Sequence, residues 1–103
     1  MARPVSGVTD PRLLLLADGD NVLITTTSIR AGEALRVDGH PVDLATDVAL
    51  GFKVAAADLA EGTTVVRLGM PIGRTTADVA RGEVVHTHNL ESLYMRTHAR
   101  GEQ

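Results

Sequence analysis

The sequence predicts a mostly β domain of seven or eight short strands with little helix. Three observations support this: a repeated phrase, β-branched segments of alternating polarity, and tight-turn residues between them. The phrase ADLAEGTTV at Ala57–Val65 returns twenty positions later as ADVARGEVV at Ala77–Val85, and Ser28–Leu35 is a looser copy. The alternation after each glycine is typical of a half-buried strand. Because glycine lacks a Cβ, we expect positive φ at the glycine of each copy, namely Gly32, Gly62 and Gly82.

The aspartates of the repeat occupy equivalent places in its two best copies. Asp58 and Asp78 each stand just before the buried apolar residue of the phrase. An aspartate in this position commonly caps a turn by accepting backbone hydrogen bonds. We therefore interpret both residues as turn caps rather than as catalytic groups.

The first 27 residues predict a loose arm followed by two strands. Residues 1–12 contain three proline or glycine residues and no periodicity, so we expect a flexible N-terminal arm. The apolar run Leu13–Ala17 predicts a strand that ends in a tight turn at Asp18–Asn21. Val22–Thr27 is rich in β-branched residues and predicts the next strand.

The middle of the chain predicts hairpins. Asp38-Gly39 lies between Ala34–Val37 and His40–Leu44, and this dipeptide favours a two-residue hairpin turn. Pro41 places the second strand at a sheet edge, because proline cannot donate to a ladder. A further strand is predicted over 48–56, with a bend at Gly51.

The last third predicts a second hairpin, a strand and a short helix. Val65–Leu68 and Ile72–Arg74 flank a turn predicted at Gly69–Pro71, and 84–87 predicts a strand. Asn89 can cap one or two helical turns over 91–98. The predicted domain spans residues 13–98, and residues 99–103 should fray.

Composition limits the classes of partner. Only 2% of the 103 residues are aromatic, so base stacking on single-stranded nucleic acid has little to use. The formal net charge of −3 also opposes binding to a phosphate backbone. The chain has no cysteine, and its longest apolar run is far shorter than the ~20 residues of a membrane helix. With no visible signal peptide, we expect a cytoplasmic protein without nucleic-acid or membrane partners.

Residues 51–90 resemble the SAF domain of the altronate/galactarate dehydratase family. The resemblance covers 13–90 and is most specific over 69–90, where Ile72-Gly73, the second copy of the phrase and His86-Thr87-His88-Asn89-Leu90 follow in family order. It implies a β-clip fold. In that family the domain is either the N-terminal part of a long enzyme or a separate small subunit.

The resemblance also implies a chemistry. The family's enzymes dehydrate sugar acids, and a relative eliminates sulfite from sulfolactate. Both are β-eliminations, in which a base removes the proton α to a carboxylate. We expect a small dehydratase subunit that is inactive without a large partner subunit carrying a divalent metal, and no cofactor bound by this chain alone. The alternative is a non-catalytic β-clip module that binds a carbohydrate acid or regulates a partner enzyme.

Two histidines are the candidate catalytic residues. His86 and His88 are two positions apart on a predicted strand, so both side chains should point to one face. Two imidazoles so placed can ligate a metal or close on a carboxylate. With no third ligand nearby we expect no metal site in this chain, and we assign the pair to proton transfer or hydrogen bonding at the substrate. The alternative is that both histidines have only a structural role.

Three further residues are candidates for substrate binding. Lys53, the single lysine, and Arg74 can hold a carboxylate, whereas a solvated lysine and an interchain salt bridge are the alternative roles. Asn89 can contact substrate or cap the predicted helix. The chain reads Gly-Phe-Lys where the family usually reads Gly-His-Lys, and Phe52 can neither ligate a metal nor move a proton. The predicted edge strands are also compatible with a homo-oligomer, because an exposed strand edge can pair with another chain.

Overall fold

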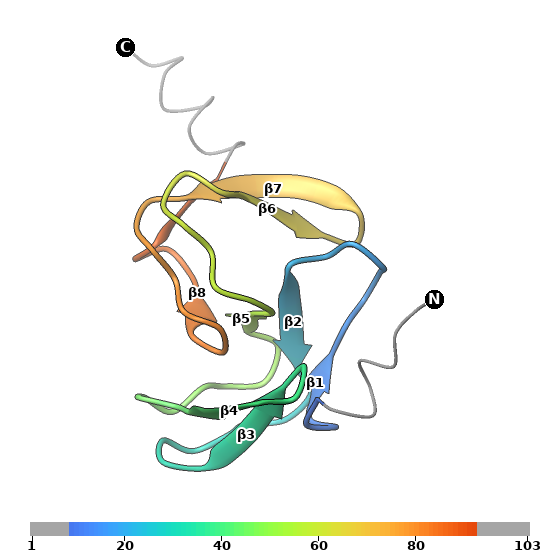
Figure 1. The fold of residues 1–103 in the computed structure, drawn as a ribbon, viewed down its shortest axis with the longest axis vertical. Coiled ribbons are helices and arrows are strands. Elements are labelled where there is room, and N and C mark those ends of the chain that lie inside the picture. Colours follow the sequence, from blue (N-terminus) through green and yellow to red (C-terminus); the bar gives the residue numbers. More distant parts are fainter. Residues whose placement is uncertain (1–8, 93–103) are drawn as a thin grey trace.

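The computed structural model describes residues 9–92, which form short antiparallel strands and no helix (Figure 1). This range holds nine strands, where the sequence predicted seven or eight, and the predicted mostly β class is confirmed. The strands are β1 (Leu13–Leu14), β2 (Val22–Thr25), β3 (Ala34–Val37), β4 (His40–Asp43), β5 (Lys53–Ala55), β6 (Thr64–Arg67), β7 (Met70–Thr75), β8 (Val84–Val85) and β9 (Leu90–Ser92).

The strands form three small sheets. A four-stranded sheet has the order β1-β2-β5-β8, β3 pairs with β4 alone, and β6-β7-β9 form the third sheet. Figure 1 shows the four-stranded sheet in the middle, with the β3–β4 hairpin on one side and the β6–β7 hairpin on the other. The two spaces between these layers hold the two apolar clusters of the core.

The two core clusters lie on opposite faces of the central sheet. Val54 belongs to the cluster under the β3–β4 hairpin, whereas its neighbour Ala55 belongs to the cluster under the β6–β7 hairpin. This division follows from the alternation of side chains along a strand. The buried members are aliphatic, as the low aromatic content required.

A fourth copy of the repeated phrase is present at residues 47–51, in the sequence Asp-Val-Ala-Leu-Gly. This segment was predicted as a strand with a bend; instead it is a turn, and β5 begins only at Lys53. The glycine has positive φ in all four copies: Gly32 (88°), Gly51 (86°), Gly62 (88°) and Gly82 (84°). A strand begins two residues after each of these glycines, at Ala34, Lys53, Thr64 and Val84.

The four copies associate in two pairs, 28–32 with 47–51 and 58–62 with 78–82. In each pair the apolar residues exchange both backbone hydrogen bonds at 2.7 to 2.8 Å, Ile29 with Val48 and Leu59 with Val79. Each glycine N–H then donates to the carbonyl three residues before the partner copy: Gly32 to Leu44, Gly51 to Thr25, Gly62 to Thr75 and Gly82 to Ala55. The chain therefore folds around two similar pairs of turns.

Aspartate side chains tie the turns of each pair together, which confirms the predicted capping role. The Asp58 carboxylate accepts a hydrogen bond from the N–H of Arg81 at 2.9 Å, and that of Asp78 accepts one from the N–H of Glu61 at 2.9 Å. Each cap reaches across to the partner copy. In the other pair, the Asp47 carboxylate accepts a hydrogen bond from the N–H of Ala31 at 2.8 Å.

Both hairpin turns contain two residues with positive φ, as a type I′ turn requires. Asp38-Gly39 is the predicted turn, with φ of 51° and 82°. Pro41 lies in β4, whose single partner in its sheet is β3, so its predicted edge position is confirmed. The second turn is Leu68-Gly69, with φ of 56° and 74°, rather than Gly69–Pro71.

Several predicted elements end earlier or differ in type. The first strand stops at Leu14, β2 at Thr25 and β8 at Val85. Glu91 and Ser92, predicted as helix, belong to β9 and pair with β7; residues 93–98 of that prediction lie outside the described residues. Residues 1–8 of the predicted arm and 99–103 also lie outside the described residues.

Residues 9–12 are anchored to the β3–β4 hairpin. The Thr9 hydroxyl accepts a hydrogen bond from the N–H of Asp38 at 2.9 Å, and the N–H of Asp10 donates to the Arg36 carbonyl at 2.8 Å. Arg12 bonds both the Asp10 carboxylate at 3.0 Å and Glu33 at 2.7 Å. The Arg12 side-chain hydrogen bond is the main cause that holds the pKa of Asp10 below its usual range.

Gly82→Ala should destabilise the domain more than Gly62→Ala. Both glycines have positive φ, which costs a residue with a Cβ roughly 1–2 kcal/mol. A Cβ at Gly82 would also overlap the Cγ1 of Val42, whereas a Cβ at Gly62 would meet nothing. Urea unfolding should show an extra loss of about 1–3 kcal/mol for Gly82→Ala, the usual range for overpacking. Equal losses in the two variants would contradict this packing.

Asp10→Asn should lower stability at pH 7 and flatten its decline in acid. Because the folded-state pKa of Asp10 is depressed, its contribution is present above the unfolded value of about 3.9 and is lost as the pH falls through the folded value. We expect a loss of about 1 kcal/mol at pH 7, since Arg12 is partly exposed. Urea unfolding between pH 2 and 7, with the exposed Asp18→Asn as control, measures it. A parallel pH profile for Asp10→Asn and wild type would contradict it.

Candidate functional site

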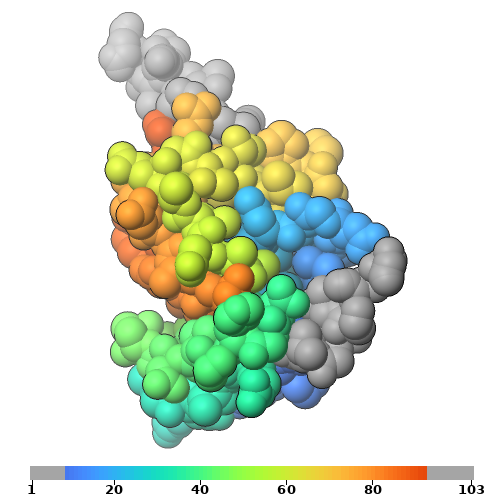
Figure 2. Space-filling model, viewed as in Figure 1, coloured from blue at the N-terminus to red at the C-terminus, as the bar shows by residue number. Residues whose placement is uncertain are grey.

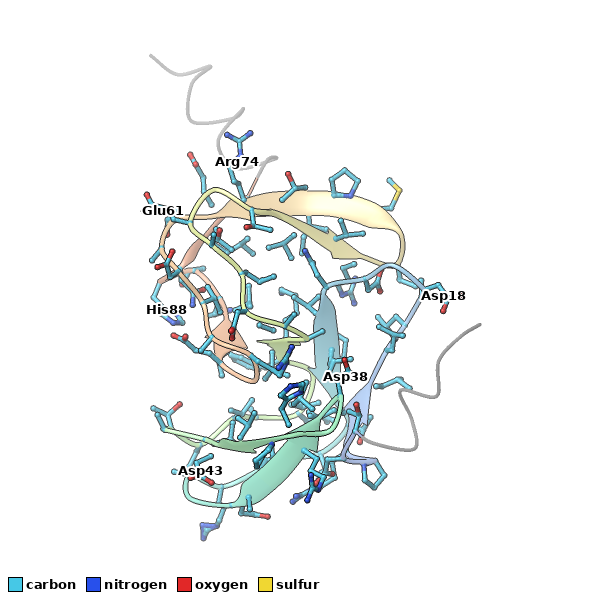
Figure 3. All side chains as sticks on the ribbon, viewed as in Figure 1. Asp18, Asp38, Asp43, Glu61, Arg74 and His88 are labelled. Carbon is cyan, nitrogen blue, oxygen red and sulfur yellow. The ribbon has the colours of Figure 1, made fainter. Side chains whose placement is uncertain are left out.

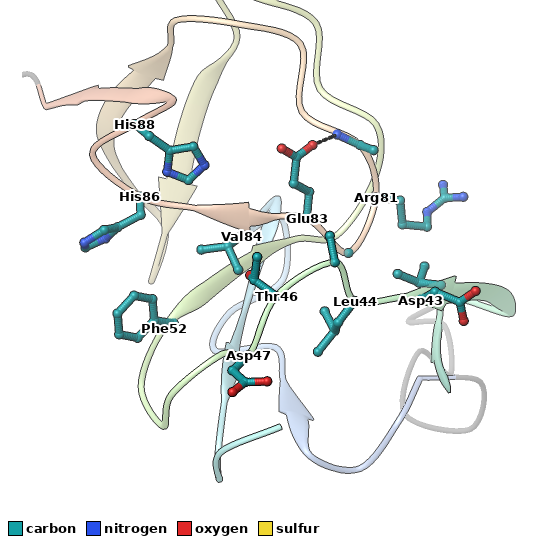
Figure 4. A pocket seen from close by; sticks show the side chains of 14 residues that line it. Asp43, Leu44, Thr46, Asp47, Phe52, Arg81, Glu83, Val84, His86 and His88 are labelled. Carbon is teal, nitrogen blue, oxygen red and sulfur yellow. Dashed lines mark hydrogen bonds between the residues drawn. The ribbon is translucent and has the colours of Figure 1, made fainter. Parts of the chain in front are cut away.

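A cleft of about 510 Å³ lies between residues 42–47 and the turn at 80–84, with His86 and His88 at one end (Figure 4). Its floor is apolar, because Leu44 belongs to the first core cluster and Val42 and Val84 pack against that cluster. The walls are therefore one hairpin and one repeat turn, held together where Gly82 meets Val42.

The two candidate histidines come together at this cleft, although not on a strand. Strand β8 ends at Val85, and residues 86–89 form a bend and turn. The expectation that the two histidines lie on one face of a strand was therefore wrong. Both side chains nevertheless line the same cleft and both are exposed.

Asn89 determines this local geometry. Its Oδ1 accepts a hydrogen bond from the N–H of His86 at 2.9 Å, and its Nδ2 donates to the Val84 carbonyl at 2.9 Å. Its own N–H donates to the carbonyl of His86 at 2.9 Å. With 3% of its surface exposed, Asn89 closes the turn that carries both histidines. It is followed by β9, so the predicted helix cap is wrong.

Phe52 lies against His86 at the same end of the cleft. The ring centroids are 4.9 Å apart and the planes are tilted by 42°. The Phe52 backbone is fixed, because its N–H donates to the buried Thr25 hydroxyl at 3.0 Å, and that hydroxyl donates to the Ala49 carbonyl at 2.7 Å. Phe52, which stands where the resemblance led us to expect histidine, is thus part of the site.

Charged residues line the opposite end, and sequence reasoning missed one of them. Arg81 lies on the cleft wall, and its Nε donates to the Ala56 carbonyl at 3.4 Å. The sequence does distinguish this position, since one copy of the repeat has Glu61 where the other copy has Arg81. Two nearby carboxylates are engaged with backbone N–H groups: Glu83 with Ala80 at 2.9 Å and Asp47 with Ala31 at 2.8 Å. A third carboxylate, Asp43, also lines the cleft and is exposed on β4, and Arg81 is the arginine among the lining residues.

Lys53 and Arg74 do not line this cleft. Lys53 is half-buried in β5 on the face that it shares with Ala55, away from the first cluster. Burial, and then the charge of Arg67, lower the pKa of Lys53. Arg74 is exposed on β7 and lies at the far edge of the molecule from the β3–β4 hairpin (Figure 3).

No three His, Asp or Glu side chains within residues 9–92 are grouped so that they could hold a metal ion. In the same range the structure contains no helix long and apolar enough to cross a membrane.

Comparison with protein families gives a match to the altronate/galactarate dehydratase SAF domain over residues 11–93, which is most of the chain. The chain belongs to this family. The match includes both pairs of repeat turns and the cleft, and it confirms the resemblance drawn from the histidine segment and the repeat. The domain is thus of the kind found in sugar-acid dehydratases.

Three relatives carry a similar segment, and two of them are much longer proteins. The chain is 43% identical to the altronate dehydratase of Escherichia coli over 70 residues, 68% of this chain and 14% of the relative. It is 34% identical to that of Bacillus subtilis over 73 residues, 71% of this chain and 15% of the relative. It is also 40% identical to the alpha subunit of (2R)-sulfolactate sulfo-lyase from Chromohalobacter salexigens over 45 residues, 44% of this chain and 48% of the relative. The chain therefore spans a small part of either dehydratase.

Asn89→Ala should displace both histidines and destabilise the domain. The change leaves the part-buried N–H of His86 and carbonyl of Val84 without their partner, which costs about 1 kcal/mol. Urea unfolding gives the loss, and ¹H–¹⁵N NMR should show large shifts at residues 84–88. Thr87→Ala, at an exposed position of the same turn, is the control and should do neither. An unchanged spectrum in Asn89→Ala would refute its role in holding the turn.

Proposed function

We propose that this chain is the small SAF subunit of a sugar-acid dehydratase and acts with a separate large subunit. The proposed reaction is the β-elimination of water from an aldonate or aldarate, which yields a 2-keto-3-deoxy acid. The observation that carries the proposal is the pair His86 and His88, which lies at one cleft within the residues that match the family, 11–93. We expect assembly in the cytoplasm.

The division into subunits is supported by the relatives. The sulfolactate sulfo-lyase relative is named as an alpha subunit, so a related domain occurs in an enzyme with more than one kind of chain. In the two altronate dehydratases the matched region is 14% and 15% of the protein, so most of each enzyme lies elsewhere. Under this proposal a large partner supplies what that remainder supplies in the dehydratases.

The proposed reaction divides the roles within the cleft. The proton α to the carboxylate leaves as a base takes it, and the hydroxyl on the next carbon departs as water after accepting a proton. The exposed imidazoles of His86 and His88 are suited to donating that proton or to holding the hydroxyl by hydrogen bonds. Arg81, at the other end of the cleft, is suited to holding a substrate carboxylate, a role earlier assigned to Lys53 and Arg74.

The divalent metal expected from the resemblance is assigned to the large partner. When bound, such a metal stabilises the enediolate formed by loss of the α proton. The described residues of this chain offer two histidines and no third ligand grouped with them, so they do not fit a metal site of their own.

Phe52 favours a second candidate function. An aromatic ring at the position of the usual family histidine, packed on His86, removes one polar group from the site. That change suits a non-catalytic module that binds a carbohydrate acid or regulates a partner enzyme. In that case no elimination product would form in any assembly that contains the chain.

The test is turnover in the complex recovered from the source cells with the tagged chain. His86→Ala and His88→Ala should each lower formation of the 2-keto-3-deoxy acid by about 10²-fold or more, since proton transfer contributes that much, while assembly is retained. His40→Ala is the control, because His40 is exposed at the turn end of the β3–β4 hairpin and does not line the cleft. Unchanged turnover in both cleft variants would refute the catalytic assignment. Recovery of the chain without a large partner would refute the subunit assignment.

A further inference from the structure

The rings of the two cleft histidines are supported differently. Within residues 9–92 neither imidazole makes a hydrogen bond to the protein. The ring of His86 packs on that of Phe52, with 4.9 Å between the centroids and a tilt of 42°. Among the same residues no aromatic ring packs on His88. The orientation of the His86 ring therefore depends on Phe52, whereas the backbone of His86 depends on Asn89.

Phe52 is itself held in place by the core. Its side chain is half-buried and packs against the first core cluster, under the β3–β4 hairpin. Its carbonyl accepts a hydrogen bond from the N–H of Thr25 at 3.0 Å, and its own N–H donates to the Thr25 hydroxyl at 3.0 Å. The Phe52 ring thus lies between a packed core and the imidazole of His86, so it can restrain that imidazole.

The contact between the two rings follows from the register of the central sheet. Lys53 of β5 pairs with Val85 of β8 in antiparallel fashion, so Phe52 and His86 are the next residues along the two strands. Residues opposite each other on antiparallel strands lie on one face, with Cβ atoms about 4.5–5.5 Å apart. The pairing of β5 with β8 therefore brings the two rings together even though β8 ends at Val85.

An aromatic ring can orient an imidazole without occupying its nitrogens. A catalytic histidine is commonly oriented by a carboxylate or a carbonyl that binds one ring nitrogen. Phenylalanine has no atom that forms such a bond, and the ring separation here lies within the roughly 4.5–7 Å that aromatic pairs prefer. His86 therefore has a restrained ring and, within residues 9–92, two unoccupied nitrogens that can carry or deliver a proton.

We propose that Phe52 is a positioning residue, which holds the His86 ring in the orientation used for proton donation. This inference rests on the proposed function, because the reaction is the one named there. Figure 4 shows the Phe52 ring next to that of His86, at the end of the cleft away from Asp43. In Figure 2 the cleft lies where the green segment after β4 meets the orange turn at 80–84.

The step that depends on this orientation is the departure of the hydroxyl. A base takes the α proton, and the electron pair of that C–H bond forms a carbon–carbon double bond as the neighbouring C–O bond breaks. The protonated His86 ring gives its proton to the departing hydroxyl, which leaves as water, and the imidazole becomes neutral. The enol that remains rearranges to the keto acid. A rotated His86 ring would deliver its proton poorly, while binding of the substrate would change little.

The first measurement is NMR of the isolated full-length chain. The Hα–Hβ couplings of His86 should report one χ1 rotamer in the wild type and rotamer averaging in Phe52→Leu, which keeps an apolar side chain but removes the ring. Phe52→Met is a second ringless variant, because methionine adapts to irregular space in a core. Phe52→Tyr keeps the ring and should keep the single rotamer.

Leu15→Ala is the matched control for lost packing. Leu15 is also half-buried against the first core cluster, but it does not line the cleft. This variant should lose stability and leave the couplings of His86 as in the wild type.

The second measurement is turnover in the complex recovered from the source cells with the tagged chain. Phe52→Leu and Phe52→Met should lower kcat by about 10- to 100-fold, as expected when a reacting group is misplaced by roughly 1 Å, and leave KM nearly unchanged. Phe52→Tyr should restore most of kcat, and Leu15→Ala should keep the wild-type values.

Several results would overturn the positioning role. They are rotamer averaging of His86 already in the wild type, a single rotamer in both ringless variants, or wild-type kcat in those variants. A fall in kcat that Leu15→Ala reproduces, or that Phe52→Tyr does not rescue, would also leave Phe52 with a structural role alone. If the wild-type complex forms no 2-keto-3-deoxy acid, the proposed function fails and the role in proton donation fails with it, whereas the couplings still decide whether Phe52 orders His86.

Discussion

The pairing of repeat turns is the constraint on which the rest of this small fold depends. Each strand that follows a glycine of the repeat can begin only where that glycine turns the chain, and each glycine N–H is bonded to the segment before the partner copy. The two pairs thereby connect segments that are far apart in sequence without a long strand or a helix. With strands of two to six residues, sheet hydrogen bonds alone would be a weak scaffold. The aspartate caps and the exchanged backbone hydrogen bonds of the paired turns add the contacts that hold these short strands in place.

The candidate site is a direct product of this scaffold. The turn at 80–82 belongs to the last copy of the repeat, and its glycine packs against Val42 to form one wall of the cleft. The strand that follows has only two residues before Asn89 closes the next turn and places His86 and His88 at the cleft. The site therefore depends on buried backbone contacts that contain no reactive group, and its histidines can vary in role without loss of the fold.

Local signals in the sequence predicted local structure well. The Asp38-Gly39 turn, the edge position of Pro41 and the capping aspartates follow from the chemistry of neighbouring residues. What could not be predicted depends on contacts distant in sequence. The turn at Leu68 exists because Asp20, 48 positions earlier, bonds its N–H. The copy at 47–51 was missed because the residues after its glycine, Phe52 and Lys53, lack the alternation that marked the others. Arg81 was not predicted as a cleft residue, because the cleft wall that it faces, residues 42–47, is distant from it in sequence.

The backbone and the side chain of Phe52 have separate roles, one in the fold and one in the candidate site. Its backbone serves the scaffold, because the Thr25 hydroxyl that binds its N–H also caps the turn at Ala49, and any side chain at this position keeps those bonds. Its ring serves the site, since it contacts His86. The exchange of histidine for phenylalanine can therefore change the chemistry of the cleft without a cost to the paired turns. The paired turns fix the place of the cleft, whereas the reaction depends on which side chains that scaffold carries there.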